Sequence, residues 1–283
     1  MGMRFLTRKD LKFPRRKPGS HKGDNGRLLV VTGSRDYAGA ACLSSMAAFR
    51  TGVDQVLVAA PSKVGWVINT YSPDIMTKKF DGDFFTVRHA AKIRLLAKNF
   101  DAMLIGNGLG LASSTRKFVK QVVKAQIPKV IDADAIKSVR LQEVRSSILT
   151  PHSRELEILL HNSGYKTATR QSSLQKKAAY LRRVAGSNVI LLKGKEDIIV
   201  SAGKAAFNRT GNPGMTHGGT GDVLAGITAA LVAQGIGLFD AACTAAFVNG
   251  HVGDALEKKK GYGFTASDML EGIPAAVREL GGW

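Results

Sequence analysis

Six short apolar runs rich in β-branched residues recur along this chain of 283 residues. They read "RLLVVTG", "QVLVAAP", "DAMLIGNG", "PKVIDAD", "SSILTPH" and "NVILLKG", and helix-compatible stretches, such as 39–51 and 113–126, separate the first five. A further helical pattern covers 171–186. Strands that are apolar along most of their length are typical of a parallel sheet with helices on both faces. The alternation therefore predicts an α/β fold with a mostly parallel central sheet.

The rest of the chain predicts an antiparallel edge and a helical end. The segment "IIVSAGKAAFN" carries an Ala-Gly-Lys turn between two apolar runs, which favours a hairpin. Three helical patterns follow, at about 220–234, 239–257 and 265–280. Because no repeat, linker or change of composition interrupts the chain, we expect a single domain over 23–283, preceded by a basic arm over 1–22.

Charge and hydropathy narrow the classes of partner. The 41 Lys and Arg residues against 22 Asp and Glu give a net charge of +19, which attracts anions such as nucleic acids or phosphorylated small molecules. No apolar run approaches the roughly 18 residues that a membrane helix needs, and the basic N-terminus lacks the apolar core of a signal peptide. We expect no membrane association and a cytoplasmic location.

Cys42 and Cys243 lie in Ala-rich helical patterns, which indicates buried packing residues.

Two glycine-rich turns follow predicted strands, where parallel sheets usually bind ligands. "VVTGSRDYAGA" lacks the Gly-Lys-Ser/Thr ending of a P-loop. "LIGNGLGLA" resembles a dinucleotide fingerprint, but Leu111 occupies the third glycine position. Either turn is equally compatible with a tight loop that binds nothing.

The segment "NPGMTHGGTGDVLAGI", residues 212–227, gives a more specific signal. Gly218, Gly219 and Gly221 surround Thr220 at the start of a helical pattern, and bare backbone amides at a helix N-terminus can bind phosphate. Asp222 follows in the first helical turn. It is either an ordinary helix cap or a base that takes a proton from an attacking hydroxyl group.

With its neighbours, this segment resembles the signature of the ADP/ATP-dependent NAD(P)H-hydrate dehydratases, which belong to the ribokinase-like superfamily. The similarity begins at "HKGDNGRLLVVTGS" and continues in family order through "LIGNGLG", "VIDADAIK", "LTPHSRELEILL" and "LLKGKEDIIV" to "ASDMLEGIPAAV". It implies a ribokinase-like three-layer sandwich. It also implies dehydration of the hydrated cofactors (6S)-NADHX and NADPHX, driven by ADP or ATP with Mg²⁺, in an enzyme that is often a homotetramer.

The resemblance assigns roles to particular residues. Asp222 would be the catalytic base and a substrate contact, together with Ala40, Gly108 and His152. An anion hole would consist of Gly219, Thr220 and Gly221, and the nucleotide would contact Gly221 and the segment Lys193, Gly194, Lys195, Glu196 and Asp197.

Other assignments stay open. Glu155 matches an acid of the superfamily that acts on magnesium through water, but a carboxylate in a first helical turn is also stabilised by the helix dipole. Asp132 and Asp134 are either strand-end caps or outer members of the magnesium shell. His217 replaces the small or apolar residues that are common in the motif, and it either adds charge near the phosphate or is a spectator.

Two rival functions remain to be separated. A small-molecule hydroxyl kinase of the same fold would share the anion hole and Asp222 but would stop at the phosphoester. A nucleic-acid-binding protein would explain the positive charge, although no stacking aromatic strand, zinc spacing or basic recognition helix supports it. Because only about twenty residues precede "HKGDNG", we expect no epimerase activity, and the S epimer would be supplied separately.

Overall fold

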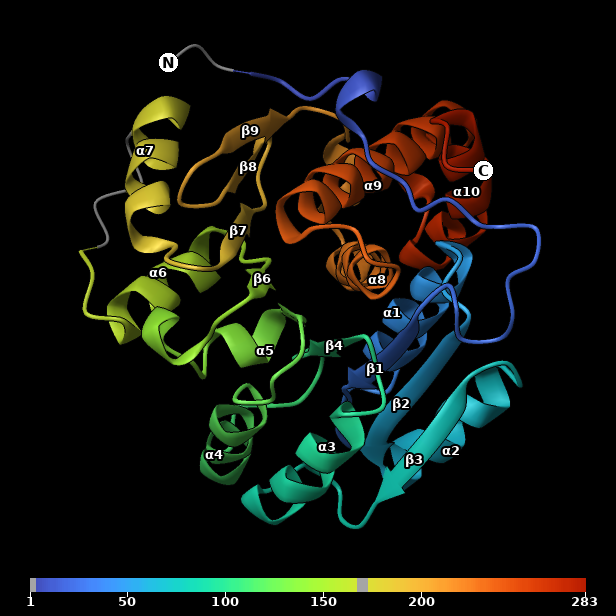
Figure 1. Cartoon of the computed structure of the whole chain (residues 1–283), viewed down its shortest axis with the longest axis vertical. Coiled ribbons are helices and arrows are strands. Elements are labelled where there is room, and N and C mark those ends of the chain that lie inside the picture. Colours follow the sequence, from blue (N-terminus) through green and yellow to red (C-terminus); the bar gives the residue numbers. More distant parts are fainter. Residues whose placement is uncertain (1–3, 167–172) are drawn as a thin grey trace.

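The computed structural model describes residues 4–166 and 173–283, and a nine-stranded sheet forms the centre of this part (Figure 1). The strand order is β3-β2-β1-β4-β5-β6-β7-β8-β9. All pairs from β3 to β7 are parallel, whereas β8 pairs antiparallel with β7 and with β9. The strands are β1 Arg27–Val31, β2 Gln55–Pro61, β3 Met76–Phe80, β4 Ala102–Ile105, β5 Lys129–Ile131, β6 Ser147–Leu149, β7 Val189–Leu192, β8 Asp197–Val200 and β9 Ala205–Asn208.

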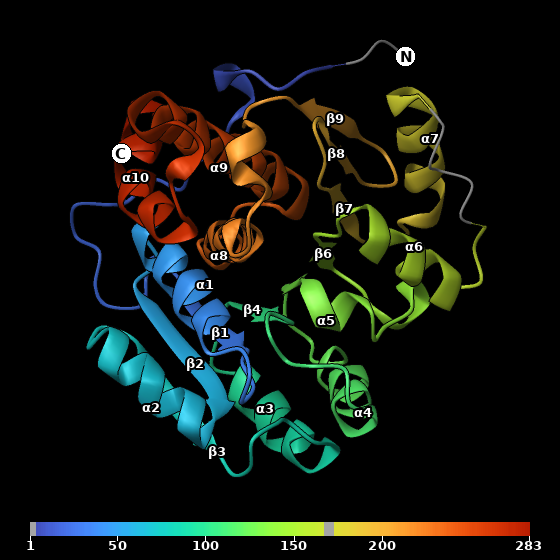
Figure 2. The ribbon, with the colours of Figure 1, turned by 180° about the vertical axis from the view of Figure 1, so that it is seen from behind.

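Helices cover both faces of the sheet, as Figures 1 and 2 show from opposite sides. The α-helices are α1 Gly39–Arg50, α2 Ser62–Tyr71, α3 Ala90–Ala97, α4 Ser113–Val122, α5 Ala133–Ile136, α6 Ser153–Asn162, α7 Leu174–Val184, α8 Thr220–Ala233, α9 Leu238–Lys260 and α10 Ala266–Glu279. Short 3₁₀ turns are η1 Arg8–Asp10, η2 Val87–His89, η3 Leu141–Glu143, η4 Pro213–Thr216 and η5 Gly261–Gly263.

Alternating side chains of the strands supply two apolar cores. In β1, Leu28 and Val30 face α1, α2, α8, α9 and α10, whereas Leu29 and Val31 face the opposite core with α3 to α7. All four side chains are fully buried. A strand apolar at every position is expected where both faces of a parallel sheet are covered, so the interpretation of the apolar runs is confirmed.

The ribokinase-like sandwich and the antiparallel hairpin are confirmed, but one edge was missed. The strand β3 pairs parallel with β2 at the end of the sheet and reads "MTKKF". Its Lys78 is exposed, and polar residues are common on edge strands because they discourage pairing with other chains. The segment "MTKKF" therefore lacked the apolar run by which the other parallel strands were recognised.

Of the predicted helix over 171–186, residues 171–172 lie outside the described part, and α7 begins at Leu174.

The basic segment before β1 lies against the sheet and α9 (Figure 1). Phe5 forms an isolated parallel bridge with Phe207 of β9, and Leu6 and Leu11 are buried. The amide of Lys12 donates to Oγ1 of Thr244 in α9 at 2.9 Å. The division into an arm over 1–22 and a domain over 23–283 stays a prediction.

Two further expectations concern hydropathy. Within 4–166 and 173–283, no helix has the length and apolarity that crossing a bilayer would take. Cys42 and Cys243 are buried in α1 and α9, as predicted, and burial raises the pKa of both thiols, that of Cys243 to about 12.

Candidate active site

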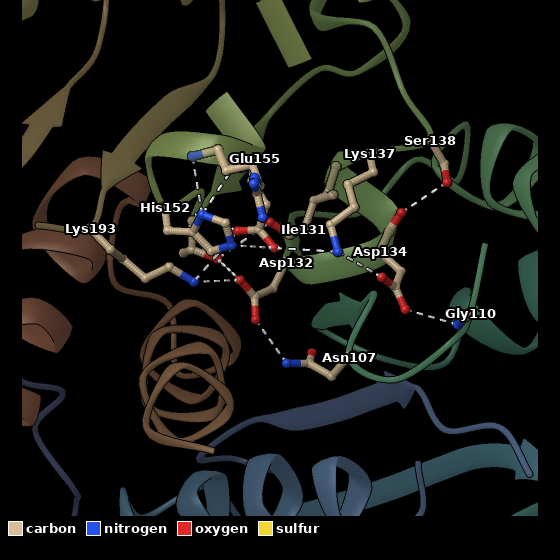
Figure 3. Close-up of polar contacts among 12 residues, drawn as sticks. Asn107, Gly110, Ile131, Asp132, Asp134, Lys137, Ser138, His152, Glu155 and Lys193 are labelled. Atoms are coloured by element: carbon tan, nitrogen blue, oxygen red, sulfur yellow. Dashed lines mark hydrogen bonds and ion pairs between the residues drawn. The ribbon is translucent and has the colours of Figure 1, made fainter. Parts of the chain in front are cut away.

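The candidate site forms where the carboxyl ends of the central parallel strands meet the N-terminus of α8. Asn107 follows β4, Asp132 follows β5, His152 follows β6 and Lys193 follows β7. Parallel strands bring these ends to one edge of the sheet, although the residues are distant in sequence. Figure 3 shows their side chains converging there.

Asp222 lies in the first turn of α8, and it does not cap this helix. Gly219 is the N-cap residue, in the left-handed region with φ 98°, and no side chain caps the helix end. Oδ1 of Asp222 instead accepts a 2.6 Å hydrogen bond from Nδ2 of Asn107. Burial, together with the nearby charge of Asp132, raises the pKa of Asp222 to about 7. A carboxyl group with that pKa can act as a base at neutral pH.

The predicted anion hole has a bare surface. Oγ1 of Thr220 donates to the carbonyl of Met215 at 2.8 Å, so this side chain turns back into the preceding loop. A Cβ added at Gly221 would lie 3.4 Å from Nζ of Lys193, which shows that these two predicted nucleotide contacts are neighbours. The helix dipole and this ammonium group together favour an anion at the start of α8.

Asp132 is the centre of a buried polar network and is only 2% exposed. Its carboxylate accepts hydrogen bonds from Oγ1 of Thr150 at 2.7 Å, from Nδ2 of Asn107 at 2.8 Å and from Nζ of Lys193 at 3.1 Å. Burial by itself lowers the pKa of Lys193, but the charges of Asp132 and Glu155 raise it above its usual value. Lys193 therefore stays an ammonium group.

Asp132 and Asp134 flank a strained residue. Ala133 adopts φ 48°, a left-handed conformation that is unfavourable for residues other than glycine. Asp132 begins α5 without a capping bond from its side chain. Asp134 accepts from the amide of Gly110 at 2.9 Å and from Nζ of Lys137 at 2.9 Å. Both carboxylates thus have partners, and their place in a magnesium shell stays open.

His152 and Glu155 cap α6 reciprocally. Nδ1 of His152 accepts from the amides of Arg154 at 3.2 Å and Glu155 at 3.4 Å, and Oε2 of Glu155 accepts from the amide of His152 at 3.1 Å. Burial lowers the pKa of His152, which favours the neutral imidazole. Nζ of Lys137 lies 3.8 Å from Oε1 of Glu155 (Figure 3).

The predicted substrate contacts Ala40 and Gly108 lie side by side. Gly108 adopts φ 63°, and an added Cβ would lie 2.7 Å from Cβ of Tyr37 and 3.5 Å from Cβ of Ala40. Glycine is therefore required here both by backbone conformation and by space. The turn after β4 packs directly on the start of α1.

The segment Lys193 to Asp197 forms the turn between β7 and β8. Oδ1 of Asp197 accepts from the amide of Gly194 at 3.0 Å, and its Oδ2 accepts from Nδ2 of Asn208 at 3.0 Å. Burial raises the pKa of Asp197 to about 6. Lys195 is exposed and Glu196 is partly exposed, so Asp197 holds the turn whereas these two face outward.

His217 packs beside the glycines. Its ring meets Phe264 edge-on at 5.6 Å, and its buried Nε2 has no partner among the described residues. Its two interpretations therefore stay open.

Asn107 and Thr150 were not selected from the sequence, although both follow predicted strands at the carboxyl end. That position was the available signal, because side chains at these ends share one edge.

Comparisons with known proteins agree with this fold. A ribokinase-like superfamily protein of Enterococcus faecalis has a TM-score of 0.85 and 26% identity, covering 99% of this chain and 97% of that one. The ADP/ATP-dependent NAD(P)H-hydrate dehydratase of Bacillus subtilis, co-crystallised with ATP and Mg²⁺, has a TM-score of 0.83 and 26% identity, with 99% of both chains covered. The fold thus defines a ribokinase-like protein.

The family follows from the sequence matches. The model of the NAD(P)H-hydrate dehydratase family matches residues 28–275, and the chain belongs to this family. The ADP-dependent (S)-NAD(P)H-hydrate dehydratase of Cenarchaeum symbiosum is 32% identical, over 98% of both chains. A bifunctional NAD(P)H-hydrate repair enzyme of Methanothermobacter thermautotrophicus is 39% identical over 94% of this chain and 52% of its own length. The chain thus spans about half the length of the first curated relatives that it matches.

Proposed function

We propose that this chain dehydrates (6S)-NADHX and NADPHX to NADH and NADPH at the expense of ADP or ATP, as a lyase of cofactor repair. Family membership and a relative of the same length support this activity. The observation that carries the mechanism is the largely buried carboxyl group of Asp222 in the first turn of α8, whose pKa is raised to about 7. It lies at the N-terminus of α8, where the helix dipole favours an anion.

The reaction takes place in two steps at this edge of the sheet. Asp222 accepts the proton of the ring hydroxyl as its oxygen attacks the terminal phosphoryl group, and ADP leaves as AMP. The phosphorylated oxygen then departs as inorganic phosphate, and loss of a ring proton restores the double bond. Transfer of this kind depends mainly on positioning and on stabilising charge.

The nucleotide would approach from the side of β7 and α8. Lys193 would contact its phosphates together with the amides of Gly219, Thr220 and Gly221, and the turn from Gly194 to Asp197 would follow its nucleoside. The positioning of Lys193 next to Gly221 supports this arrangement. The substrate ring would contact Asp222, Ala40, Gly108 and His152.

Magnesium would accompany the phosphates. Among the described residues no group of three or more His, Cys, Asp or Glu side chains could hold a metal ion alone. Mg²⁺ in phosphoryl-transfer sites is usually bound by one or two carboxylates with substrate phosphates and water. The almost fully buried Glu155, facing Lys137 and Lys193, fits a contact through water rather than direct ligation. When bound, the ion would neutralise developing phosphate charge.

The assembly and its location are further parts of the proposal. We propose a homo-oligomer, a tetramer by family resemblance. Exposed apolar side chains on α2 and the edge strand β3 support association: Trp66 is 63% exposed, Tyr71 48% and Met76 43%. Light scattering coupled to gel filtration tests it.

We propose a cytoplasmic location because nicotinamide dinucleotides are intracellular cofactors.

One assay tests the activity. NADHX is mixed with ADP or ATP and Mg²⁺, and NADH absorbance and inorganic phosphate are followed together. Formation of NADH with one phosphate per turnover supports the dehydratase. A stable phosphorylated product without NADH would instead identify a hydroxyl kinase.

A further inference from the structure

Asn107 has a position in the site that no assigned role explains. It is fully buried directly after β4, and its carbonyl accepts from the amide of Gly33 at 3.0 Å and from Oγ1 of Thr32 at 2.5 Å. The preceding Gly106 adopts φ 139°, and an added Cβ would lie 1.8 Å from the carbonyl oxygen of Asp132. The backbone is therefore held between β1 and β5, which fixes the side chain.

The Asn107 side chain joins two carboxylates. Nδ2 donates to Oδ1 of Asp222 at 2.6 Å and to Oδ2 of Asp132 at 2.8 Å, so the NH₂ group serves both acids. Two carboxylates that share one NH₂ group repel each other, and the charge of Asp132 accordingly raises the pKa of Asp222. The amide separates them and supplies a donor to each.

The remaining atom of the amide faces no protein donor. Oδ1 of Asn107 is buried and accepts no hydrogen bond among the described residues. A buried acceptor without a partner is costly, and it indicates a group that is supplied from outside the chain. A bound substrate can supply that group, because its neighbour Asp222 is the residue proposed to contact the reacting hydroxyl.

We propose that Asn107 is a positioning residue, which orients the Asp222 carboxylate through Nδ2 and accepts a hydrogen bond from a donor of the bound substrate through Oδ1. This inference rests on the proposed function and adds to it a residue and a polar contact to the hydrated ring. With one oxygen of Asp222 held by Asn107, the other oxygen is directed to the proton of the substrate hydroxyl.

The same contact sets the charge of the base. Burial raises the pKa of Asp222, and the charges of Asp132 and Asp134 raise it further, whereas the bond from Asn107 and the charge of Lys193 lower it. Removing Nδ2 therefore stabilises the protonated form of Asp222. Less of the base is then available at neutral pH.

The test uses two variants, Asn107→Leu, which conserves size, and Asn107→Ala, which avoids a clash. A hydrogen bond to a charged group is worth about one pH unit or more in the titration of its acceptor. We expect the acidic limb of the kcat profile to move upward by about that amount, with a loss of kcat of roughly fivefold or more at neutral pH. KM for NADHX should rise, while KM for ADP stays near that of the parent.

Thr150→Val is the matched control. Thr150 donates to the same Asp132 at 2.7 Å, and in the described part of the chain its hydroxyl group has hydrogen bonds only with Asp132 and Ile131, not with Asp222. If Asn107 were only structural, its variants and this control would lower the melting temperature alike and leave the pH midpoint unchanged. That result, in both Asn107 variants, would overturn the proposal.

NMR titration of labelled aspartate carboxyl groups separates this inference from the proposed function. It follows Asp222 without turnover, with Asp222→Asn identifying the signal. If the parent enzyme converts no NADHX, the proposed activity fails, yet an upward shift of this titration in both Asn107 variants would still support the positioning of Asp222.

Discussion

Replacing Asp222 by Asn removes a base while preserving the shape of the site. The Asn side chain has the same size, and its carbonyl oxygen can still accept the bond that Nδ2 of Asn107 donates at 2.6 Å. It cannot take a proton from the substrate hydroxyl. General-base assistance is typically worth about 10²- to 10⁴-fold, so turnover of NADHX should fall by at least that order.

The same change should stabilise the fold above neutral pH. The pKa of Asp222 rises from 3.8 to about 7 on folding, mainly through burial. A group with a raised folded pKa contributes stability that is fully present below its unfolded pKa and is lost as pH rises through its folded pKa. At about 1.36 kcal/mol per unit, burying the charged form costs up to about 4 kcal/mol in alkaline buffer. Asp222→Asn should remove this cost there, and its advantage should disappear towards pH 4.

The measurements belong on one sample. NADHX turnover, calorimetric binding of ADP and the melting temperature are recorded across pH for parent and variant. ADP binding should persist, because backbone amides, which the substitution leaves in place, make up the proposed anion hole. For the parent, kcat should rise with pH through about 7. Turnover within a few-fold of the parent would refute the role of Asp222 as base, and a lower melting temperature in alkaline buffer would refute the electrostatic reasoning.

Three further changes test other parts of the site and fold. Lys193→Ala should weaken ADP binding about 10- to 150-fold in calorimetry, because a charge-assisted contact is worth roughly 1.5–3 kcal/mol; unchanged affinity would restrict this lysine to its protein partners. Gly219→Ala should lower the free energy of unfolding by about 1–3 kcal/mol or more, because φ is 98° and an added Cβ would lie 2.7 Å from Leu43, whereas Gly218→Ala, with no atom within 4 Å, serves as the control. Burial lowers the pKa of Lys129 to about 8. The contribution of Lys129 to the free energy of unfolding is therefore fully present above its unfolded pKa and is lost as pH falls through about 8. The advantage of the parent over Lys129→Met in urea unfolding should therefore grow from pH 8 towards pH 10.5, and a pH-independent difference would contradict this.

The parts of the fold that were predictable are those with a repeated physical signal. Each strand buried on both faces must be apolar throughout, as Leu28 to Val31 are, and such runs are legible in the sequence. The edge strand β3 obeys the opposite rule, because Lys78 faces solvent. β3 forms only because β2 lies beside it and pairs with it, and the local sequence of β3 does not encode this long-range contact.

Some parts of the candidate site were also predictable from local sequence, and others were not. The glycine signature was predictable because binding of an anion by backbone amides needs closely spaced residues without side chains. The contacts around Asp132 combine the ends of β4, β5, β6 and β7, and these meet only through strand order. A buried Asn has no distinctive spacing in the sequence. Asn107 could be found only from the hydrogen bonds that its Nδ2 donates in the structure.

The network also explains how acids could lie beside the proposed phosphate site. Asp132 and Asp222 carry charge that would repel a nucleotide, but Lys193 and Asn107 hold Asp132, and Asp222 is only about half ionised near pH 7. When phosphate binds at the start of α8, its charge favours protonation of Asp222, whereas the proton of the attacking hydroxyl needs an ionised acceptor. A base with a pKa near neutrality satisfies both conditions. It is ionised often enough to take that proton, and its average charge repels the phosphate only weakly. In the proposed mechanism, burial of Asp222 in the first turn of α8 would therefore serve the chemistry, and the loss of stability as pH rises towards about 7 follows from the same cause.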